Sequence, residues 1–209
     1  MQPITLALAK GRPAKSTIAL LEKTDVQFND FHEDSRKLVF YNNDRSIKLL
    51  FVKAIDVPTY VEKGAADIGI VGKDNILESK ADVYELLDLK IGKCKFAVAG
   101  KKNYTPEKGQ LLTIATKYPA IAQKHFDKKG EAIEIVKLNG SVELAPLIGL
   151  ADLIVDIVET GNILKENGLT VLENIEPIST RLIVNKASFA TKSTEVQQFI
   201  SQLKSALEG

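Results

Sequence analysis

The sequence predicts an α/β protein of two lobes. Apolar runs that resemble strands alternate with amphipathic segments that resemble helices almost from end to end, which is typical of parallel α/β sheets. Two stretches, 83–100 and 169–186, are long, strand-rich and only weakly helical in period, so each is expected to run from one sheet to another. These crossings predict a discontinuous first lobe, 1–88 plus 175–209, and an inserted second lobe, 92–172, with a ligand cleft between the two lobes.

The composition agrees with a globular protein and excludes several classes. Of the 209 residues, 44% are hydrophobic and 26% are charged, and the net charge of +1 gives no support for a nucleic-acid partner. Cys94 is the single cysteine, so an intrachain disulfide is impossible. Lys10 and Arg12 interrupt the short apolar start, and no stretch approaches the length of a membrane helix. We expect a soluble, cytoplasmic protein that does not bind a membrane.

The first half of the chain contains four predicted strands and three predicted helices. Strands are expected at 4–9, 38–41, 47–52 and 67–72, with a turn at 42–44. Pro13 opens a helix with Ala14, Ile18 and Leu21 on one face, because proline suits the first helical position. Asp56 is expected to cap a short helix that stops near Gly64, and residues 73–78 begin another.

The second half repeats this alternation. Strands are predicted at 111–116, 131–138 and 152–158, and helices at 118–129, 141–150 and 160–168. The last helix, 194–207, begins with the capping-box pair Thr194 and Gln197. An apolar stripe follows along this helix, formed by Val196, Phe199, Ile200, Leu203 and Leu207.

Glycine-containing turns follow four of the predicted strands, where open α/β sheets bind their ligands. They are Lys10-Gly11-Arg12, Gly72-Lys73-Asp74, Asn139-Gly140-Ser141 with Glu143, and Thr160-Gly161-Asn162. Helix N-termini and the cations beside Gly11 suit phosphates. Each turn also has a structural explanation: a solvated basic turn, a turn capped by Asp74, or a helix start capped by Ser141.

The fourth turn has the most distinctive chemistry. The apolar run 152–158 leads into DIVETGNIL, residues 156–164. Thr160 and the amides of Gly161 and Asn162 can receive a phosphate, while Asp156 and Glu159 can accept hydrogen bonds from ribose hydroxyls. The two carboxylates can also support positive charge at an anomeric carbon. The alternative is a turn that happens to be acidic.

Other candidates are weaker. His32 and His125 are isolated and lack zinc-site spacing, and Cys94 lies in an apolar strand typical of a core. Arg36 and Arg45 flank the strand at 38–41 and, from spacing alone, are surface charges.

Three segments resemble the ATP phosphoribosyltransferases, which catalyse the first step of histidine biosynthesis. They are LAKGRP (8–13), DVPTYVEKGAADIGIVGKDNILE (56–78) and LNGSVELAPLIGLADLIVDIVETGNILKENGL (138–169). The resemblance implies two lobes like those of type II periplasmic binding proteins, with the active site in the cleft between them. It implies that N1 of ATP displaces pyrophosphate from 5-phosphoribosyl 1-pyrophosphate (PRPP), with substrate-bound Mg²⁺ as the cofactor and no metal held by protein ligands.

The resemblance also implies roles for individual residues. Asp156 and the loop residues Glu159, Thr160, Gly161, Asn162 and Ile163 would bind PRPP, although many relatives carry threonine at the position of Ile163. ATP would contact Lys10, Gly11, Arg12, Gly72, Lys73, Asp74 and Glu143. Lys10, Arg12, Arg36 and Asp156 would be catalytic, the three cations by steadying the phosphates.

The chain stops near the helix at 194–207, which resembles the short form of the family. Short-form relatives work with a regulatory subunit that resembles histidyl-tRNA synthetase, so a hetero-oligomer is expected. The main alternative is a two-lobed phosphosugar- or solute-binding protein without catalysis. The absence of an export signal and the Asp156/Glu159 pair favour the enzyme.

Overall fold

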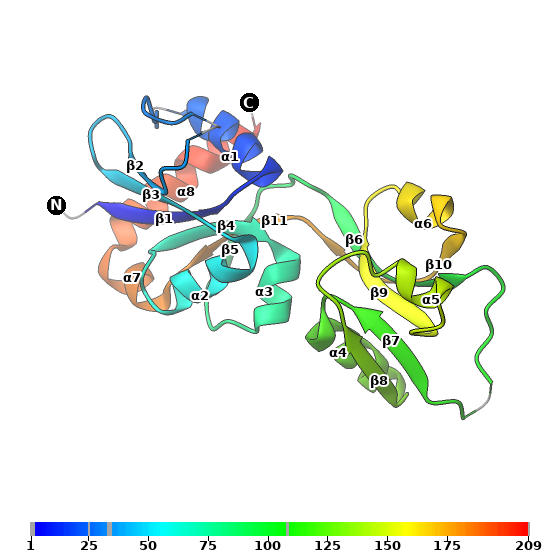
Figure 1. The fold of residues 1–209 in the computed structure, drawn as a ribbon. Coiled ribbons are helices and arrows are strands. Elements are labelled where there is room, and N and C mark those ends of the chain that lie inside the picture. Colours follow the sequence, from blue (N-terminus) through cyan, green and yellow to red (C-terminus); the bar gives the residue numbers. More distant parts are fainter. Residues whose placement is uncertain (1–2, 25, 33–34, 108, 209) are drawn as a thin grey trace. The chain divides into compact units, whose positions relative to one another are not determined.

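The protein folds into two units, each with its own sheet (Figure 1). The structure, a computed structural model, describes residues 3–24, 26–32, 35–107 and 109–208, and of Arg12 and Pro13 only the backbone. Unit 1 comprises Met1–Gly92 and Ser179–Gly209, and unit 2 comprises Lys93–Ile178. The domain boundaries that the sequence indicates, 1–88 plus 175–209 for one lobe and 92–172 for the other, stay a prediction.

Unit 1 contains a mixed sheet with the strand order β2-β3-β1-β4-β11-β5. Its strands are β1 (Ile4–Ala9), β2 (Val39–Tyr41), β3 (Ile47–Val52), β4 (Ile68–Gly72), β5 (Tyr84–Asp88) and β11 (Thr180–Val184). β1 lies parallel to β3 and β4, whereas β2, β5 and β11 pair antiparallel with their neighbours. The carboxyl ends of β1 and β4 therefore share one edge of the sheet.

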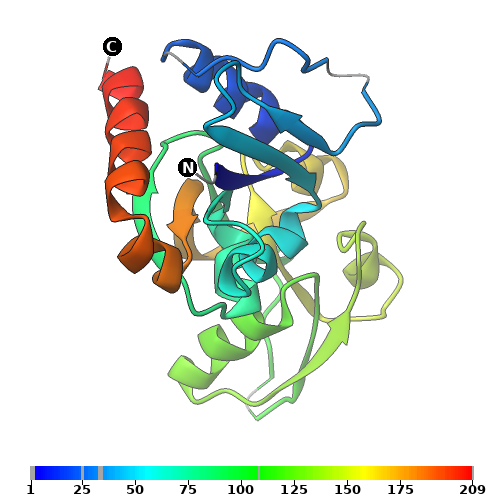
Figure 2. The same cartoon turned by 90° about the vertical axis from the view of Figure 1, so that its left-hand side faces the viewer.

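Helices cover both faces of this sheet. They are α1 (Arg12–Glu22), the 3₁₀ turn η1 (Ala54–Asp56), α2 (Val57–Glu62), α3 (Lys73–Ser79), α7 (Lys186–Thr191) and α8 (Ser193–Glu208). Leu6 and Leu8 of β1 pack in one core with residues of α1 and α8, while Ala7 and Ala9 point into the core with α2 and α3. This alternation follows from the period of two along a strand. Figure 2 shows α8 as the long red helix at the end of the chain.

Unit 2 contains a second mixed sheet with the strand order β10-β6-β9-β7-β8. Its elements are β6 (Cys94–Lys101), β7 (Leu112–Thr116), α4 (Pro119–Lys129), β8 (Ile133–Lys137), α5 (Leu144–Leu147), β9 (Leu153–Val158), α6 (Asn162–Glu166) and β10 (Leu169–Ile178). β7 lies parallel to β8 and β9, and β6 is antiparallel to β9 and β10. Val98 and Val155 pack in the core with α4, whereas Ala97 and Ile154 pack in the core with α5 and α6.

The two strand-rich stretches do cross between sheets, as the sequence predicts. β5 lies in the sheet of unit 1 and β6 in that of unit 2, and β10 and β11 make the return crossing. The crossing segments bind each other: Thr180 N donates to Ile91 O at 2.9 Å and Ser179 Oγ donates to Asp88 Oδ1 at 2.7 Å. The strands next to the crossings run antiparallel to their neighbours, whereas the alternating strands pair in parallel as predicted, so both sheets are mixed.

Some predicted local features differ in the structure. The helix expected at 141–150 is reduced to α5, because Ser141 and Gly149 adopt positive φ angles of 49° and 76° on either side of it. Ser141 is thus not the N-cap, a position that Glu143 occupies without a capping hydrogen bond from its side chain. Asp56 precedes α2 but likewise makes no side-chain cap. None of the described helices is both long and apolar enough to span a bilayer.

Candidate active site

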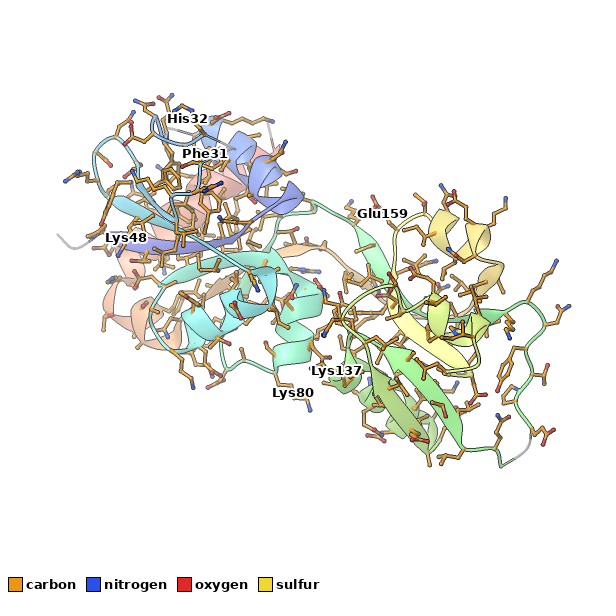
Figure 3. The ribbon with its side chains drawn as sticks, in the orientation of Figure 1. Phe31, His32, Lys48, Lys80, Lys137 and Glu159 are labelled. Atoms are coloured by element: carbon orange, nitrogen blue, oxygen red, sulfur yellow. The ribbon has the colours of Figure 1, made fainter. Side chains whose placement is uncertain are left out.

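The loop after β9 turns the chain directly into α6. Gly161 adopts φ 80° and ψ 2°, a left-handed conformation that glycine accommodates without strain. The amide of Asn162 donates to Thr160 Oγ1 at 3.4 Å, and the amide of Lys165 donates to Gly161 O at 3.0 Å. Glu159, labelled in Figure 3, is exposed on this loop. The loop therefore presents a hydroxyl, backbone amides and a carboxylate to solvent.

A cavity of about 220 Å³ lies beside this loop. Ala97, Ala99 and Ile154 form part of its wall, and the small side chains of the two alanines leave space there. The polar residues that line it are Glu143, Asp156, Glu159, Thr160 and Asn162. The structure thus brings together the whole predicted 156–163 set, and it adds Glu143 from the start of α5 to the same cavity.

The Asp156 carboxylate is largely buried because of its place in the strand. Asp156 pairs in register with Ala97 and points to the same face of the sheet as Ile154 and Val158, toward α5 and α6. Burial and, to a smaller extent, the neighbouring Glu143 carboxylate together raise the pKa of Asp156 from 3.8 to about 6, against the opposing effects of the Ile157 amide and the charge of Lys117. The site therefore disfavours the ionised carboxylate until a positive group enters.

Lys117 is a site residue that the sequence analysis does not identify. β7 is parallel to β9 and Thr116 is in register with Val155, so Lys117 follows β7 close to Asp156. Thr116 Oγ1 donates to Val155 O at 2.6 Å and fixes this strand end. The charge of Lys117 acts to lower the pKa of Asp156. The position of Lys117 just after a strand parallel to β9 is the sequence signal for it.

A second cavity, of about 210 Å³, lies at the carboxyl end of β1 in unit 1. Lys10, Gly11, Lys15 and Lys37 line it, so its surroundings are basic. Gly11 has φ 105°, and an added Cβ would meet no atom within 4 Å. The conformation of the turn, rather than crowding, therefore favours glycine there.

Aromatic rings form the other side of the unit 1 cavity. Phe31 stacks on Phe51 with 5.2 Å between the ring centroids and meets Phe40 edge-on at 5.5 Å. Phe31 and His32, both labelled in Figure 3, lie on the segment between α1 and β2 and line the cavity. The sequence analysis sets His32 aside because it is isolated in the chain, and only the fold brings it near Lys10.

Comparisons with known proteins identify the family of the chain. The family model HisG, described as ATP phosphoribosyltransferase, matches residues 53–205. The chain is 64% identical over 207 residues to the ATP phosphoribosyltransferase of Oceanobacillus iheyensis, covering 99% of this chain and 100% of that protein. The chain belongs to the ATP phosphoribosyltransferase family.

Solved structures show the same relationship. The chain is similar to a chain of the ATP phosphoribosyl transferase (HisG:HisZ) complex from Thermotoga maritima, with a TM-score of 0.87, 38% identity and 98% of each chain covered. It also shares its fold, at a TM-score of 0.60 and 13% identity, with the periplasmic aliphatic sulphonate binding protein SsuA from Escherichia coli, covering 99% of this chain and 73% of that one. The predicted type II periplasmic-binding-protein fold is therefore confirmed.

The cationic residues that the family resemblance implies differ in whether they line the unit 1 cavity. Lys10 lines the unit 1 cavity, whereas the side chain of Arg12 lies outside the described residues. Arg36 is exposed and does not line that cavity, although its neighbours Ser35 and Lys37 do. Arg45 is exposed above the ring of Tyr41, 5.5 Å from its centroid.

The side chains of the turn Gly72-Lys73-Asp74 make polar contacts with other residues of unit 1. An added Cβ on Gly72 would lie 2.2 Å from Asp74 Oδ1, so a larger residue there would have to displace the Asp74 side chain. Lys73 Nζ lies 3.0 Å from Glu85 Oε1, and Asn75 Nδ2 donates to Asp74 Oδ2 at 2.8 Å. None of the three turn residues lines the cavity around Lys10, although β4 ends beside β1. Their predicted contact with ATP stays a prediction.

Proposed function

We propose that this ATP phosphoribosyltransferase transfers the phosphoribosyl group of PRPP to N1 of ATP. The products are N1-(5-phosphoribosyl)-ATP and pyrophosphate, and the reaction is the first step of histidine biosynthesis. The observation that carries the proposal is the cavity that the partly buried carboxylate of Asp156 lines together with the loop 159–163. Membership of the family supports the choice of substrates.

The loop after β9 supplies the groups that a ribose 5-phosphate needs. The hydroxyl of Thr160 and the amides of Gly161, Asn162 and Ile163 are donors for the phosphate at the start of α6. Glu159 and Asp156 accept hydrogen bonds from the ribose hydroxyls. Because Ile163 brings no hydroxyl, its part in this site is limited to its amide and an exposed apolar side chain.

Asp156 has a second role once the reaction begins. As the bond from C1 to pyrophosphate breaks, positive charge develops on the ribose ring, and an ionised carboxylate nearby stabilises that charge more than it stabilises the neutral ground state. The partial burial of Asp156 strengthens this effect, because the local dielectric is low. With a pKa of about 6 the carboxylate is mostly ionised at pH 7, and the charge of Lys117 favours this ionised form.

The lysines of the unit 1 cavity are suited to phosphates. Lys10, together with Lys15 and Lys37, places positive charge beside Gly11, whose backbone permits close approach. We assign Lys10, Gly11 and Arg12 to the phosphates of ATP and the leaving pyrophosphate, and Arg36 to the same task from its exposed position. We also assign Gly72, Lys73 and Asp74, at the end of β4, to the binding of ATP.

Mg²⁺ belongs to the substrates in this proposal. Within the described ranges, no three His, Cys, Asp or Glu side chains gather as they would around a metal ion. Mg²⁺ in phosphoryl sites keeps water ligands and is bound largely through substrate phosphates. When bound, it neutralises charge on the pyrophosphate that leaves.

A regulatory subunit that resembles histidyl-tRNA synthetase is the proposed partner. The similar chain from Thermotoga maritima is part of a HisG:HisZ complex. We therefore propose that this chain also works in a hetero-oligomer with a HisZ-type subunit.

The test is product formation by the purified chain with ATP, PRPP and Mg²⁺, with pyrophosphatase present to draw the reaction forward. The assay is repeated with the regulatory subunit added. Product that depends on PRPP in either mixture supports the proposal, and a gain with the subunit supports the partner. Folded protein that gives no product in both mixtures contradicts the proposal and favours a phosphosugar-binding protein.

A further inference from the structure

The end of β7 leaves the last part of β9 without a strand on one edge. The last pair in the parallel register of the two strands is Thr116 with Val155. β7 ends at Thr116, whereas β9 continues to Val158. Asp156 therefore lies where β9 still pairs with β6 on one edge but has lost β7 on the other. Other groups have to replace the backbone partners on that edge, because buried backbone groups are almost always hydrogen-bonded.

Two side chains supply the missing partners. Thr116 Oγ1 donates to Val155 O at 2.6 Å and accepts from the amide of Tyr118 at 2.9 Å. Asp156 Oδ1 accepts from the amide of Ile157 at 2.8 Å. The peptide group that joins Val155 to Asp156 is thus fixed by the hydroxyl of Thr116, and the carboxylate is oriented on this fixed backbone.

The surroundings of Thr116 make its hydroxyl difficult to replace. Thr116 is completely buried, so water is kept away from its hydrogen bond to Val155 O. Tyr118 is also buried and meets Phe96 of β6 edge-on, with 5.0 Å between the ring centroids. Phe96 is in register with Ile157 of β9. The end of β9 is therefore held from both edges, by Thr116 on one side and by β6 on the other.

The loop 159–163 is anchored by different contacts. Leu164 of α6 is buried in the same core as Ala97 and Ile154, and the amide of Lys165 donates to Gly161 O. These contacts do not involve Thr116. Loss of the Thr116 hydroxyl should consequently disturb Asp156 more than it disturbs the groups assigned to the 5-phosphate.

We propose that Thr116 is a positioning residue for the proposed reaction: through its hydrogen bond to Val155 O, it holds the Asp156 carboxylate where the ribose develops positive charge. The inference rests on the proposed function. Thr116 touches no substrate in this proposal and acts only through Asp156. The stabilisation that a carboxylate gives to a developing charge depends on its position, and a displacement of about 1 Å can cost about 10²-fold in rate.

The first experiment compares Thr116→Val and Thr116→Ser with wild-type protein in the complete assay, including the regulatory subunit. Valine keeps the shape of the side chain and removes the hydroxyl, whereas serine keeps the hydroxyl. We expect Thr116→Val to lower kcat by about 10- to 100-fold, with the KM for PRPP within about threefold of the wild-type value. Thr116→Ser should keep kcat within about threefold of the wild-type value.

Thr113→Val is the matched control. Thr113 lies near the start of the same strand, and its amide, not its hydroxyl, donates to Asp152 Oδ2 at 2.8 Å. The same substitution there should leave kcat and the KM for PRPP unchanged. If Thr116→Val does not fold, Thr116→Cys takes its place with the same expectation, because a thiol is only a weak donor.

The second experiment observes the Asp156 carboxyl group without turnover. Its ¹³C signal is titrated in aspartate-labelled protein and assigned by its absence in Asp156→Asn. Burial is the chief cause that raises the pKa of Asp156 to about 6, while Glu143 and Lys117 act on it in opposite directions. Thr116→Val frees the end of β9 and admits water, so the midpoint should fall toward 3.8 by about half a pH unit or more. Thr113→Val and Thr116→Ser should keep the wild-type midpoint.

The outcomes separate this inference from the proposed function. No product from folded wild-type protein contradicts the function itself. With an active wild-type protein, a Thr116→Val variant that retains wild-type kcat overturns the role of Thr116. So does a Thr116→Ser or Thr113→Val variant that loses as much kcat as Thr116→Val. A reduced kcat in Thr116→Val with an unchanged Asp156 midpoint also overturns the inference, because the hydroxyl would then not act through Asp156.

Discussion

Asp156 shows how a single residue can serve catalysis at a cost in stability. The pKa of its carboxylate rises from 3.8 to about 6 on folding, chiefly because the group is buried. Between these values the folded state binds more protons than the unfolded state, so stability falls as the pH rises through this window. The sequence contains an acidic residue at this place, but the shift depends on burial and on the Glu143 carboxylate, which only the fold brings close to it.

Asp156→Asn should therefore stabilise the protein at neutral pH while impairing turnover. The uncharged amide avoids the cost of burying an ionised group, so we expect a gain of about 2–3 kcal/mol at pH 8. The gain should shrink toward pH 4, where the wild-type carboxylate is protonated in the folded state. Urea unfolding at pH 4, 6 and 8 measures this. A variant that is equally or less stable than the wild type at pH 8 would show that the carboxylate is not destabilised by its surroundings.

Thr160 tests the phosphate half of the same site. Thr160→Val keeps the shape of the side chain and removes the hydroxyl that we assign to the 5-phosphate. Hydrogen bonds to charged groups contribute about 1.5–3 kcal/mol, so the KM for PRPP should rise by roughly ten- to a hundredfold, with little change in the KM for ATP. Thr170→Val on β10 is the control and should leave both KM values unchanged. An unaltered KM for PRPP in Thr160→Val would remove the hydroxyl from the site.

At the scale of elements, the strands are easier to predict than the short helices. β1, β3 and β9 are mainly apolar runs, and the structure has them within about one residue of the predicted limits. α5 fails because SVELAPLIGL has apolar residues at helical spacing, while the positive φ angles of Ser141 and Gly149 limit the helix to one turn. Backbone conformation at a non-glycine residue such as Ser141 leaves no mark in the hydrophobic pattern.

One buried acid adds polar contacts to the apolar packing that attaches the last two helices to the unit 1 sheet. Asp67, which precedes β4, accepts from Ser188 Oγ of α7 at 2.6 Å, from Lys192 Nζ at 2.9 Å and from the amide of Thr5 at 2.8 Å. These partners hold the pKa of Asp67 below its usual value, against the opposing effect of burial. The ionised carboxylate of Asp67 therefore stabilises the folded state above pH 3.8, and this stabilisation is lost as the pH falls through the lowered pKa.

Lys192→Met should reveal this attachment. It leaves Asp67 charged and nearly buried without its cation, while Lys192 itself is partly exposed, so we expect a loss of about 2 kcal/mol in the free energy of unfolding. Thermal melts at pH 7 should show a Tm lower by roughly 4–8 °C. Lys204→Met, on the exposed side of α8, should leave the Tm within about 1 °C of the wild-type value. Equal melts for the two variants would mean that the ion pair contributes nothing to the attachment.

At the scale of the whole molecule, the sequence indicates the two crossings but not the strand pairing that they produce. The stretches 83–100 and 169–186 lack helical periodicity, which is why they predict passage between sheets. Their long-range partners, such as β11 beside β4 and β6 beside β9, follow from where each strand enters its sheet. Pairings between such distant segments have no local signal in the chain. For the same reason the sequence shows that Lys117 follows a strand, but only the pairing of β7 with β9 places it close to Asp156.

Unit 2 should fold and bind PRPP without unit 1. Each hydrophobic cluster lies wholly within one unit, and Cys94 and Ile178, near the two ends of the segment 93–178, are paired in register between β6 and β10. Excision therefore removes no strand from the unit 2 sheet and leaves the two ends together. Asp156 and the loop 159–163 all belong to this segment. We therefore expect it to unfold cooperatively in urea and to bind PRPP in a calorimetric titration, but to bind ATP more weakly than the whole chain does.

The same segment with Thr160→Val should bind PRPP roughly ten- to a hundredfold more weakly. A folded segment that ignores PRPP while the whole chain binds it would show that unit 1 supplies essential contacts to the phosphoribosyl group.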